Sequence, residues 1–191
     1  ELMYGTVYQT QVYRNLQGGV GEWVDVSPNV SGSKPFFTPL TINPETPWVL
    51  YTGAVWIWRS HDAGRSWKEM PNTILNGDLQ ADLITAIAVT PANPFVILAG
   101  RGAEVYRSDD DGDSWWASRF DAKVNNVELS PFDDRLAVVC LAQTSDQGPQ
   151  LYRSVDGGRT WTASGQGLPP FAVQVARWHP LEEQTIFAGT D

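Results

Sequence analysis

Carboxylates and hydroxyls recur together at three places in this chain of 191 residues. Each place has the order Tyr or Trp, Arg, Ser, any residue, Asp, any residue, Gly, any residue, Ser or Thr, Trp, at residues 58–67, 106–115 and 152–161. Clustered carboxylates can act as general acids or bases, or bind a hard cation such as Ca²⁺. A catalytic or metal site is needed only once, so three copies predict a structural role and no bound metal or cofactor.

A tight turn accounts for each residue type in the repeated group. Glycine adopts a positive φ without strain, and Asp and Ser side chains accept hydrogen bonds from nearby backbone amides. The Trp then covers the turn with a large apolar surface. The predicted turn residues are Ser60, Asp62, Gly64 and Trp67; Ser108, Asp110, Gly112 and Trp115; and Ser154, Asp156, Gly158 and Trp161.

The spacing of the turns predicts the fold. Trp67, Trp115 and Trp161 follow one another at intervals of 48 and 46 residues, and a degenerate copy runs from Tyr13 to Trp23. Short β-rich runs flank every turn. A period of about 40–50 residues holding about four strands is typical of a β-propeller blade. The predicted strands are 36–42, 48–52, 55–59 and 66–70; 84–89, 96–100, 104–108 and 114–118; and 124–129, 136–141, 150–153 and 160–163.

We therefore predict an all-β propeller of four-stranded antiparallel blades within a single domain. The expected repeats are 1–30, 31–79, 80–122, 123–170 and a partial one at 171–191. Residues 2–7 match 186–191, so the chain starts and stops at a second strand, with a first strand at 173–179. The favoured interpretation is part of a larger propeller; a closed four-bladed ring and assembly between chains remain as alternatives.

The segments 60–67, 108–115 and 154–161 resemble the Asp-box, or bacterial neuraminidase repeat. Proteins with this repeat include sialidases, xyloglucanases, sortilin-type receptors and a photosystem II assembly factor, and many are exported or membrane-associated. The resemblance implies a propeller, an extracellular or periplasmic location, and a non-catalytic scaffold that binds a protein or glycan partner. The alternative is a section of a glycoside hydrolase of xyloglucanase or sialidase type.

Residues for glycoside hydrolysis are hard to find outside the turns. Two carboxyl groups facing each other across a cleft would be needed. The loop carboxylates are Asp78, Asp82, Glu104, Asp121, Asp133, Asp134, Asp146, Glu182 and Glu183, and no pair stands out, although Asp82 precedes an inner strand. The Arg-Ile-Pro segment of sialidases is absent, and Arg59, Arg107 and Arg153 share one repeat position, which indicates blade structure. The catalytic residues, if any, are unknown.

Two other groups of side chains have competing interpretations. The first group consists of tryptophans outside the motif: Trp48, Trp56, Trp116 and Trp178. They could form platforms on which sugar rings stack, but we favour a role in packing between blades. Residues 109–113 superficially resemble a calcium loop, but they lack the Glu that ends an EF-hand loop. A solvated acidic turn is the favoured explanation.

The composition excludes several classes of protein. A net charge of −9 and scattered basic residues argue against nucleic-acid binding. No apolar run approaches the roughly 20 residues that span a bilayer. Cys140 is the only cysteine and lies in an apolar run, which predicts a buried packing role, and with two histidines the chain offers no zinc-type cluster.

Overall fold

A computed structural model describes residues 1–30, 32–70 and 82–190, and its regular elements are all β-strands. They form five antiparallel sheets, here called blades 1 to 5. The strands are β1 (Met3–Thr6), β2 (Val12–Asn15) and β3 (Val24–Asp25); β4 (Leu40–Ile42), β5 (Leu50–Gly53), β6 (Ile57–Ser60) and β7 (Lys68–Glu69); β8 (Ile84–Thr90), β9 (Asn93–Arg101), β10 (Glu104–Ser108) and β11 (Trp116–Arg119); β12 (Val124–Leu129), β13 (Ala137–Leu141), β14 (Leu151–Ser154) and β15 (Thr162–Ser164); and β16 (Val173–Trp178) and β17 (Ile186–Thr190).

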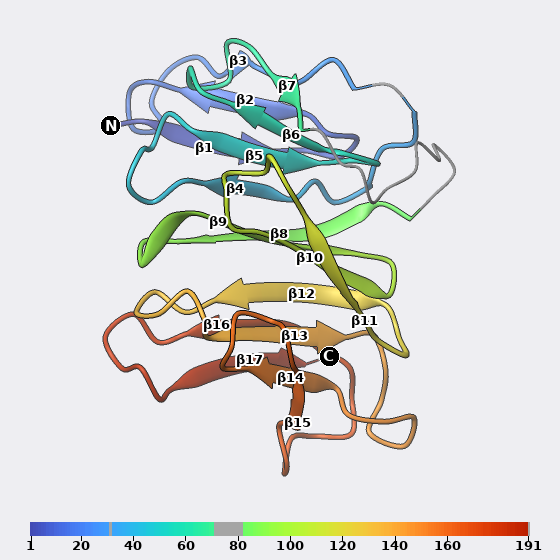
Figure 1. Cartoon of the computed structure of the whole chain (residues 1–191). Coiled ribbons are helices and arrows are strands. Elements are labelled where there is room, and N and C mark those ends of the chain that lie inside the picture. Colours follow the sequence, from blue (N-terminus) through green and yellow to red (C-terminus); the bar gives the residue numbers. More distant parts are fainter. Residues whose placement is uncertain (31, 71–81, 191) are drawn as a thin grey trace.

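The blades follow one another in chain order, each packed face to face on the next (Figure 1). Blades 2, 3 and 4 have four strands joined in sequence order, blade 1 has three and blade 5 has two. This arrangement is the predicted all-β stack of four-stranded antiparallel blades. Among the described residues, none forms a helix long and apolar enough to cross a membrane.

The first strands of neighbouring blades lie next to one another, since β8 contacts both β4 and β12, and β12 contacts β16. Side chains on these strands reach across: the Thr85 hydroxyl donates to the carbonyl of Val124 (2.9 Å), and the Asn125 amide donates to the carbonyl of Val173 (3.2 Å). These bonds tie blade 3 to blade 4 and blade 4 to blade 5 at equivalent positions.

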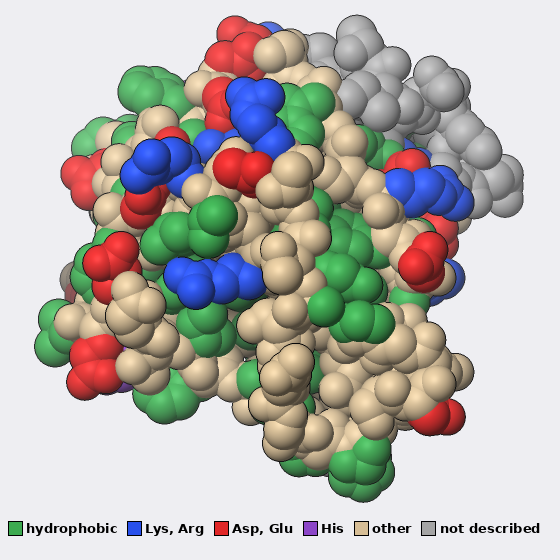
Figure 2. All heavy atoms as spheres, turned by 60° about the horizontal axis from the view of Figure 1, so that its bottom comes forward, with side chains coloured by type: hydrophobic (Ala, Val, Ile, Leu, Met, Phe, Trp, Pro, Cys, Tyr) green, Lys and Arg blue, Asp and Glu red, His purple; other side chains and the backbone are tan. Residues whose placement is uncertain are grey.

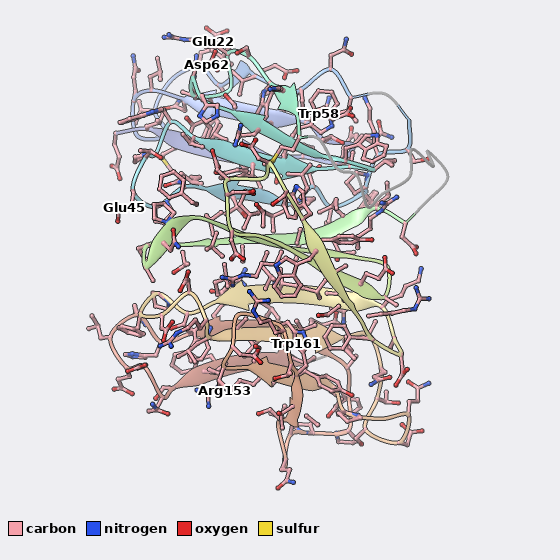
Figure 3. All side chains as sticks on the ribbon, viewed as in Figure 1. Glu22, Glu45, Trp58, Asp62, Arg153 and Trp161 are labelled. Carbon is pink, nitrogen blue, oxygen red and sulfur yellow. The ribbon has the colours of Figure 1, made fainter. Side chains whose placement is uncertain are left out.

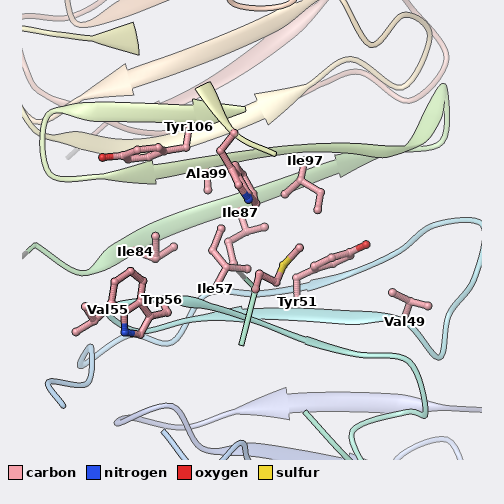
Figure 4. Close-up of a cluster of buried hydrophobic side chains, with 12 residues drawn as sticks. Val49, Tyr51, Val55, Trp56, Ile57, Ile84, Ile87, Ile97, Ala99 and Tyr106 are labelled. Atoms are coloured by element: carbon pink, nitrogen blue, oxygen red, sulfur yellow. The ribbon is translucent and has the colours of Figure 1, made fainter. Parts of the chain in front are cut away.

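Hydrophobic cores fill the spaces between blades. Tyr51 and Ile57 of blade 2 pack against Ile97 and Tyr106 of blade 3 (Figure 4). A second core joins blades 3 and 4, and a third joins blades 4 and 5. Cys140 lies in the third core with no exposed surface, and burial raises the pKa of its thiol to about 12. The expected packing role therefore fits its position.

The strand limits differ from prediction in a systematic way. The fourth strands β7, β11 and β15 begin two residues later than expected, because the Ser or Thr and the Trp before them still belong to the turn. The first strand of blade 2 is only β4, since Phe36 and Phe37 are exposed and outside the ladder. Strand β9 begins at Asn93, three residues before its predicted start at residue 96.

Candidate functional site

The three repeated turns have the same hydrogen-bond network. In blade 3 the Ser108 hydroxyl donates to Asp110 Oδ1 (2.8 Å) and accepts from the amide of Gly112 (2.7 Å). The Ser114 amide donates to Asp110 Oδ1 (2.8 Å) and its hydroxyl to Oδ2. The same bonds join Ser60, Asp62, Gly64 and Ser66 in blade 2, and Ser154, Asp156, Gly158 and Thr160 in blade 4. Both oxygens of each Asp are therefore occupied within its own turn.

These bonds fix the charge of the three carboxylates. Hydrogen bonds from Ser66 and Thr160 lower the pKa of Asp62 and Asp156 to about 2, and those from Ser114 lower the pKa of Asp110. Hydrogen bonds to a carboxylate favour its ionised form. At neutral pH these carboxylates hold no proton to donate, so they cannot act as general acids.

The backbone of the turn contains two successive left-handed residues. Ala63 and Asp111 have φ of 60° and 57°, and the glycine after each has φ of 82° and 88°. The degenerate turn of blade 1 keeps this shape at Gly18 and Gly19, with φ of 66° and 88°. There the Asn15 side chain replaces the Ser, and its Oδ1 accepts from the Gly19 amide (2.9 Å). Blade 1 thus carries a turn of the same geometry despite its different sequence.

The motif tryptophans do more than cover their own turns. Trp115 is 8% exposed, and its Nε1 donates to the carbonyl of Gly112 in its own turn (3.0 Å). Trp67 Nε1 instead donates to the carbonyl of Val26 in blade 1 (2.6 Å). The ring of Trp161, labelled in Figure 3, packs edge-on against Phe120 of blade 3. Each Trp therefore also lies against the preceding blade, a contact that sequence spacing did not predict.

The arginine at one repeat position of blades 1, 2 and 3 forms hydrogen bonds with the following blade. Arg14 Nη1 donates to the carbonyl of Ala63 (2.7 Å), and Arg59 Nη1 donates to that of Asp111 and pairs with its carboxylate (2.6 Å). Arg107 lies against the equivalent Gly157 and donates to the carbonyl of Asp134 (2.7 Å). These arginines link blade to blade.

A groove opens between blades 2 and 3 beside these links. Its lining includes Asn43, Glu45, Trp48, His61 and Phe95, and its volume is about 300 Å³. Trp48 and Phe95 are 54% and 61% exposed. Their carbonyls accept from the amides of Ala63 and Asp111 (2.9 and 2.8 Å), so both occupy the same position in successive blades. This groove combines exposed aromatic rings with carboxylate, amide and imidazole groups.

The structure separates the four tryptophans outside the motif. Trp56 and Trp178 are buried, 9% and 6% exposed, and the guanidinium of Arg153 stacks on the Trp178 ring. Trp116 is partly covered by Arg159. Packing accounts for these three, and Trp48 is the one whose ring is open to solvent.

Three of the loop carboxylates form ion pairs with separate basic residues. Asp82 pairs with Lys123 (3.2 Å), Asp133 with Arg135 (2.7 Å) and Glu104 with Arg119 (3.1 Å). Asp78 lies outside the described residues. Within the acidic run 109–113, Asp109 binds Arg107. Asp110 is held in its turn, and Asp111 also accepts from the Tyr51 hydroxyl (2.8 Å). In the parts of the chain described, no three His, Cys, Asp or Glu side chains are grouped to hold a metal ion.

Glu128 is a carboxylate outside the predicted loops. It lies on β12, 22% exposed, and its Oε2 accepts from Arg177 Nη1 of blade 5 (2.8 Å). Burial raises its pKa to about 7, which outweighs the opposite effect of Arg177. An acidic residue inside the apolar strand 124–129 was the sequence signal for it.

Charged side chains of both signs are interspersed on the face turned forward in Figure 2. Lys and Arg do not gather there into a basic patch of the kind that binds a phosphate backbone. This face gives no support to nucleic-acid binding.

The fold has clear relatives among solved structures, whereas no family model and no curated protein matches the sequence. An ancestral GH74 enzyme superposes with a TM-score of 0.75 at 18% identity, over 98% of this chain and 25% of that one. The COPII outer coat vertex on membranes gives 0.72 at 10% identity, over 99% and 53%. YCF48 from Cyanidioschyzon merolae gives 0.65 at 13% identity, over 95% and 61%, and a YCF48 structure with bound D1 peptide also matches.

These superpositions establish the β-propeller fold. At sequence identities this low, they say nothing about the activity of the chain. The chain spans 25% of the GH74 enzyme and 61% of YCF48. Any function of a longer propeller is therefore a proposal for this chain.

Proposed function

We propose that this chain is a segment of an Asp-box propeller that serves as a non-catalytic binding or assembly scaffold. The observation that carries the proposal is the state of the repeated carboxylates. Asp62, Asp110 and Asp156 have both oxygens bonded inside their turns, and their pKa values are lowered. The polar groups repeated in blades 2, 3 and 4 are thus used by the fold itself.

The groove between blades 2 and 3 is the proposed contact site for a partner. Aromatic rings with one apolar face and nearby polar groups suit both peptide side chains and sugar rings. Trp48 and Phe95 supply the rings, and Glu45 and His61 supply polar atoms at the rim. The partner we propose is a protein or a glycan, contacted outside the cytoplasm, as the Asp-box resemblance implies.

The fold neighbours offer a precedent for each kind of partner. YCF48 is seen with a D1 peptide, and COPII forms a coat on membranes. The GH74 enzyme represents the alternative, a section of a glycoside hydrolase. The exposed ring of Trp48 is the feature that fits this alternative.

Soluble xyloglucan tests the glycan partner and the hydrolase together. Affinity electrophoresis in xyloglucan gels measures binding, and release of reducing ends measures hydrolysis. Retardation without hydrolysis, lost in Trp48→Ala, would support a glycan-binding scaffold. Hydrolysis by the pure chain would overturn the non-catalytic proposal.

A photo-reactive phenylalanine derivative at position 48 tests the protein partner. The same derivative at Phe171, which is 52% exposed and outside the groove lining, is the matched control. We expect one cross-linked polypeptide from position 48 and none from position 171. Absence of both xyloglucan binding and a specific cross-link would refute the groove as the contact site.

A further inference from the structure

The side of blade 4 that faces away from blade 3 has a hollow, lined by Arg153 and Ser164, that resembles the surfaces on which the β-turns of other blades rest. Within the chain, the turn of each blade rests on two residues of the preceding blade: the arginine of the third strand and a residue of the fourth strand, or next to it. In the first two junctions these pairs are Arg14 with Val26 and Arg59 with Met70. In the third, Arg107 and Ser118 lie under the turn of blade 4.

The second residue of each pair contacts the turn glycine. A Cβ added to Gly64 would lie 2.9 Å from Val26 Cγ2, and one added to Gly112 would lie 1.8 Å from Met70 Cε. The Ser118 hydroxyl donates to the carbonyl of Gly158 (2.9 Å). This contact is repeated at every junction whose turn the structure describes.

Blade 4 presents the fourth pair, Arg153 and Ser164, on which no turn of the described chain rests. The two strands keep the register of the other blades, because Arg153 pairs with Thr162 as Arg107 pairs with Trp116. Ser164 therefore occupies the position of Ser118. Arg153 and Ser164 line a hollow of about 290 Å³ with Val155, Thr160, Thr162 and Ala163.

Arg153 lines this hollow and is labelled in Figure 3. Its guanidinium stacks on Trp178 of blade 5, at 5.7 Å from the ring centroid. Among the described residues it has no hydrogen-bond or ion-pair partner, whereas Arg14, Arg59 and Arg107 each donate to a carbonyl of the next blade. The hollow thus offers one cationic donor and one hydroxyl donor to backbone carbonyls.

The neighbouring sheet is open on the same side. Blade 5 has only β16 and β17, so the outer edge of β17 has no neighbouring strand in the described chain. Phe187 pairs with Arg177 in the register in which Leu98 pairs with Ala88 and Val138 with Glu128. Leu98 and Val138 are buried at 1% and 0%, whereas Phe187 is 58% exposed. Unpaired edges of this kind are sites for strand addition.

We propose that the hollow at Arg153 and Ser164 is a binding site for a β-hairpin that adds the third and fourth strands to blade 5. The hairpin carries a turn with two successive left-handed residues, as in Ser-x-Asp-x-Gly. The carbonyl of the first left-handed residue accepts from Arg153, and that of the glycine accepts from Ser164. Its first strand pairs with β17.

A second copy of the whole chain fits this site poorly. Its turns in blades 2, 3 and 4 are already seated on its own preceding blades. Its remaining turn, in blade 1, is attached to β1, which occupies in blade 1 the place that β17 occupies in blade 5. The two strands would compete for one position.

An extended chain tests the proposal. Residues 142–164 contain the segment that follows β13, including β14, the turn and β15, and a copy of them is appended after Asp191. We expect the extension to slow amide exchange in β17 by about tenfold and to raise the thermal midpoint. Replacing the Ser and Asp of the appended turn by Ala should remove most of this gain.

Arg153→Gln and Ser164→Trp are the test variants in the main chain, and Arg65→Gln, at an exposed position, is the charge-matched control. Each is compared with its own unextended form, so a loss of stability from the substitution itself cancels. Arg153→Gln should abolish the gain and Arg65→Gln should keep it. Ser164→Trp fills the hollow from an exposed position and should also abolish it.

Three outcomes would overturn the proposal: no gain from the extension, an equal gain in Arg153→Gln, or a dimer of the unextended chain in light scattering that Arg153→Gln separates. The last would assign the hollow to a second copy. The proposal deepens the assembly role proposed above, but Trp48 is outside this hollow. Trp48→Ala should leave the gain unchanged, so failure at one site is distinguishable from failure at the other.

Discussion

At the scale of single residues, the buried hydroxyl of Ser108 stabilises its turn through three hydrogen bonds. It is fully buried, donates to Asp110 and accepts from the amides of Asp110 and Gly112. Ser108→Ala leaves the Gly112 amide buried without this acceptor. Such a loss costs about 1–3 kcal/mol. We expect a decrease of that size in the free energy of unfolding, measured by urea titration.

Ser33→Ala is the control for this prediction, because Ser33 is exposed. Substitutions at exposed positions usually change stability by less than about 0.5 kcal/mol. Equal effects of the two substitutions would contradict a structural role for the motif serine.

Glu128 makes stability depend on pH in a predictable direction. Its pKa rises from 4.5 to about 7 on folding because burial disfavours the charged form. Between these values the folded chain holds a proton that the unfolded chain has lost. The contribution of Glu128 is therefore most favourable below about pH 4.5 and is lost as pH rises through about 7.

Glu128→Gln removes this titration and keeps an acceptor for Arg177. Relative to wild type, the variant should gain on the order of 1–3 kcal/mol when the pH is raised from 5 to 8. Urea titrations at both pH values measure the difference. Glu69→Gln, at an exposed position of β7, should show no such change, and a wild-type-like pH profile for Glu128→Gln would disprove the assignment.

At the scale of elements, the turn glycines combine two requirements that substitutions can separate. Gly112 has φ of 88°, and an added Cβ would meet Met70 Cε at 1.8 Å. Gly167 has φ of 87° with nothing within 4 Å. Gly167→Ala should therefore cost only the backbone strain, about 1–2 kcal/mol. Gly112→Ala must in addition displace the buried Met70 side chain, so the thermal midpoint of this variant should be clearly lower than that of Gly167→Ala. Equal midpoints of the two variants would mean that the contact between Gly112 and Met70 is dispensable.

Trp115 tests the packing between blades 2 and 3. It belongs to the core shared by these blades and is 8% exposed. Trp115→Ala should cost about 3–5 kcal/mol in the free energy of unfolding, as for other buried aromatic residues. Trp48→Ala, at a 54% exposed position, is the matched control. A loss below about 1 kcal/mol for Trp115→Ala would rule out its role in the core.

The sequence was most informative where a motif is complete within one turn. Strands β10 and β12 have the predicted limits, and Ser108, Asp110 and Gly112 make the bonds their types suggest. Contacts between blades were out of reach, because Arg59 and Asp111 are 52 residues apart and only packing brings them together. The groove at Trp48 and Phe95 was missed for the same reason, since its lining comes from two blades.

At the scale of the whole molecule, stability is shared between neighbouring blades. The hydrophobic cores join blades 2 and 3, 3 and 4, and 4 and 5. Repeat proteins built this way depend on nearest-neighbour contacts, and repeats at the ends have fewer of them. A two-stranded sheet is also marginal without further support. Blade 5, with β16 and β17, combines both disadvantages.

We therefore expect amide exchange to show a gradient along the stack. Amides of β16 and β17 should exchange faster than those of β9 and β13, which are central strands of blades 3 and 4 and have neighbours on both sides. Exchange followed by mass spectrometry of peptic fragments measures each strand separately. Uniform protection would mean that the chain opens only as a whole. It would also mean that β17, despite its open edge, is held as firmly as the central strands.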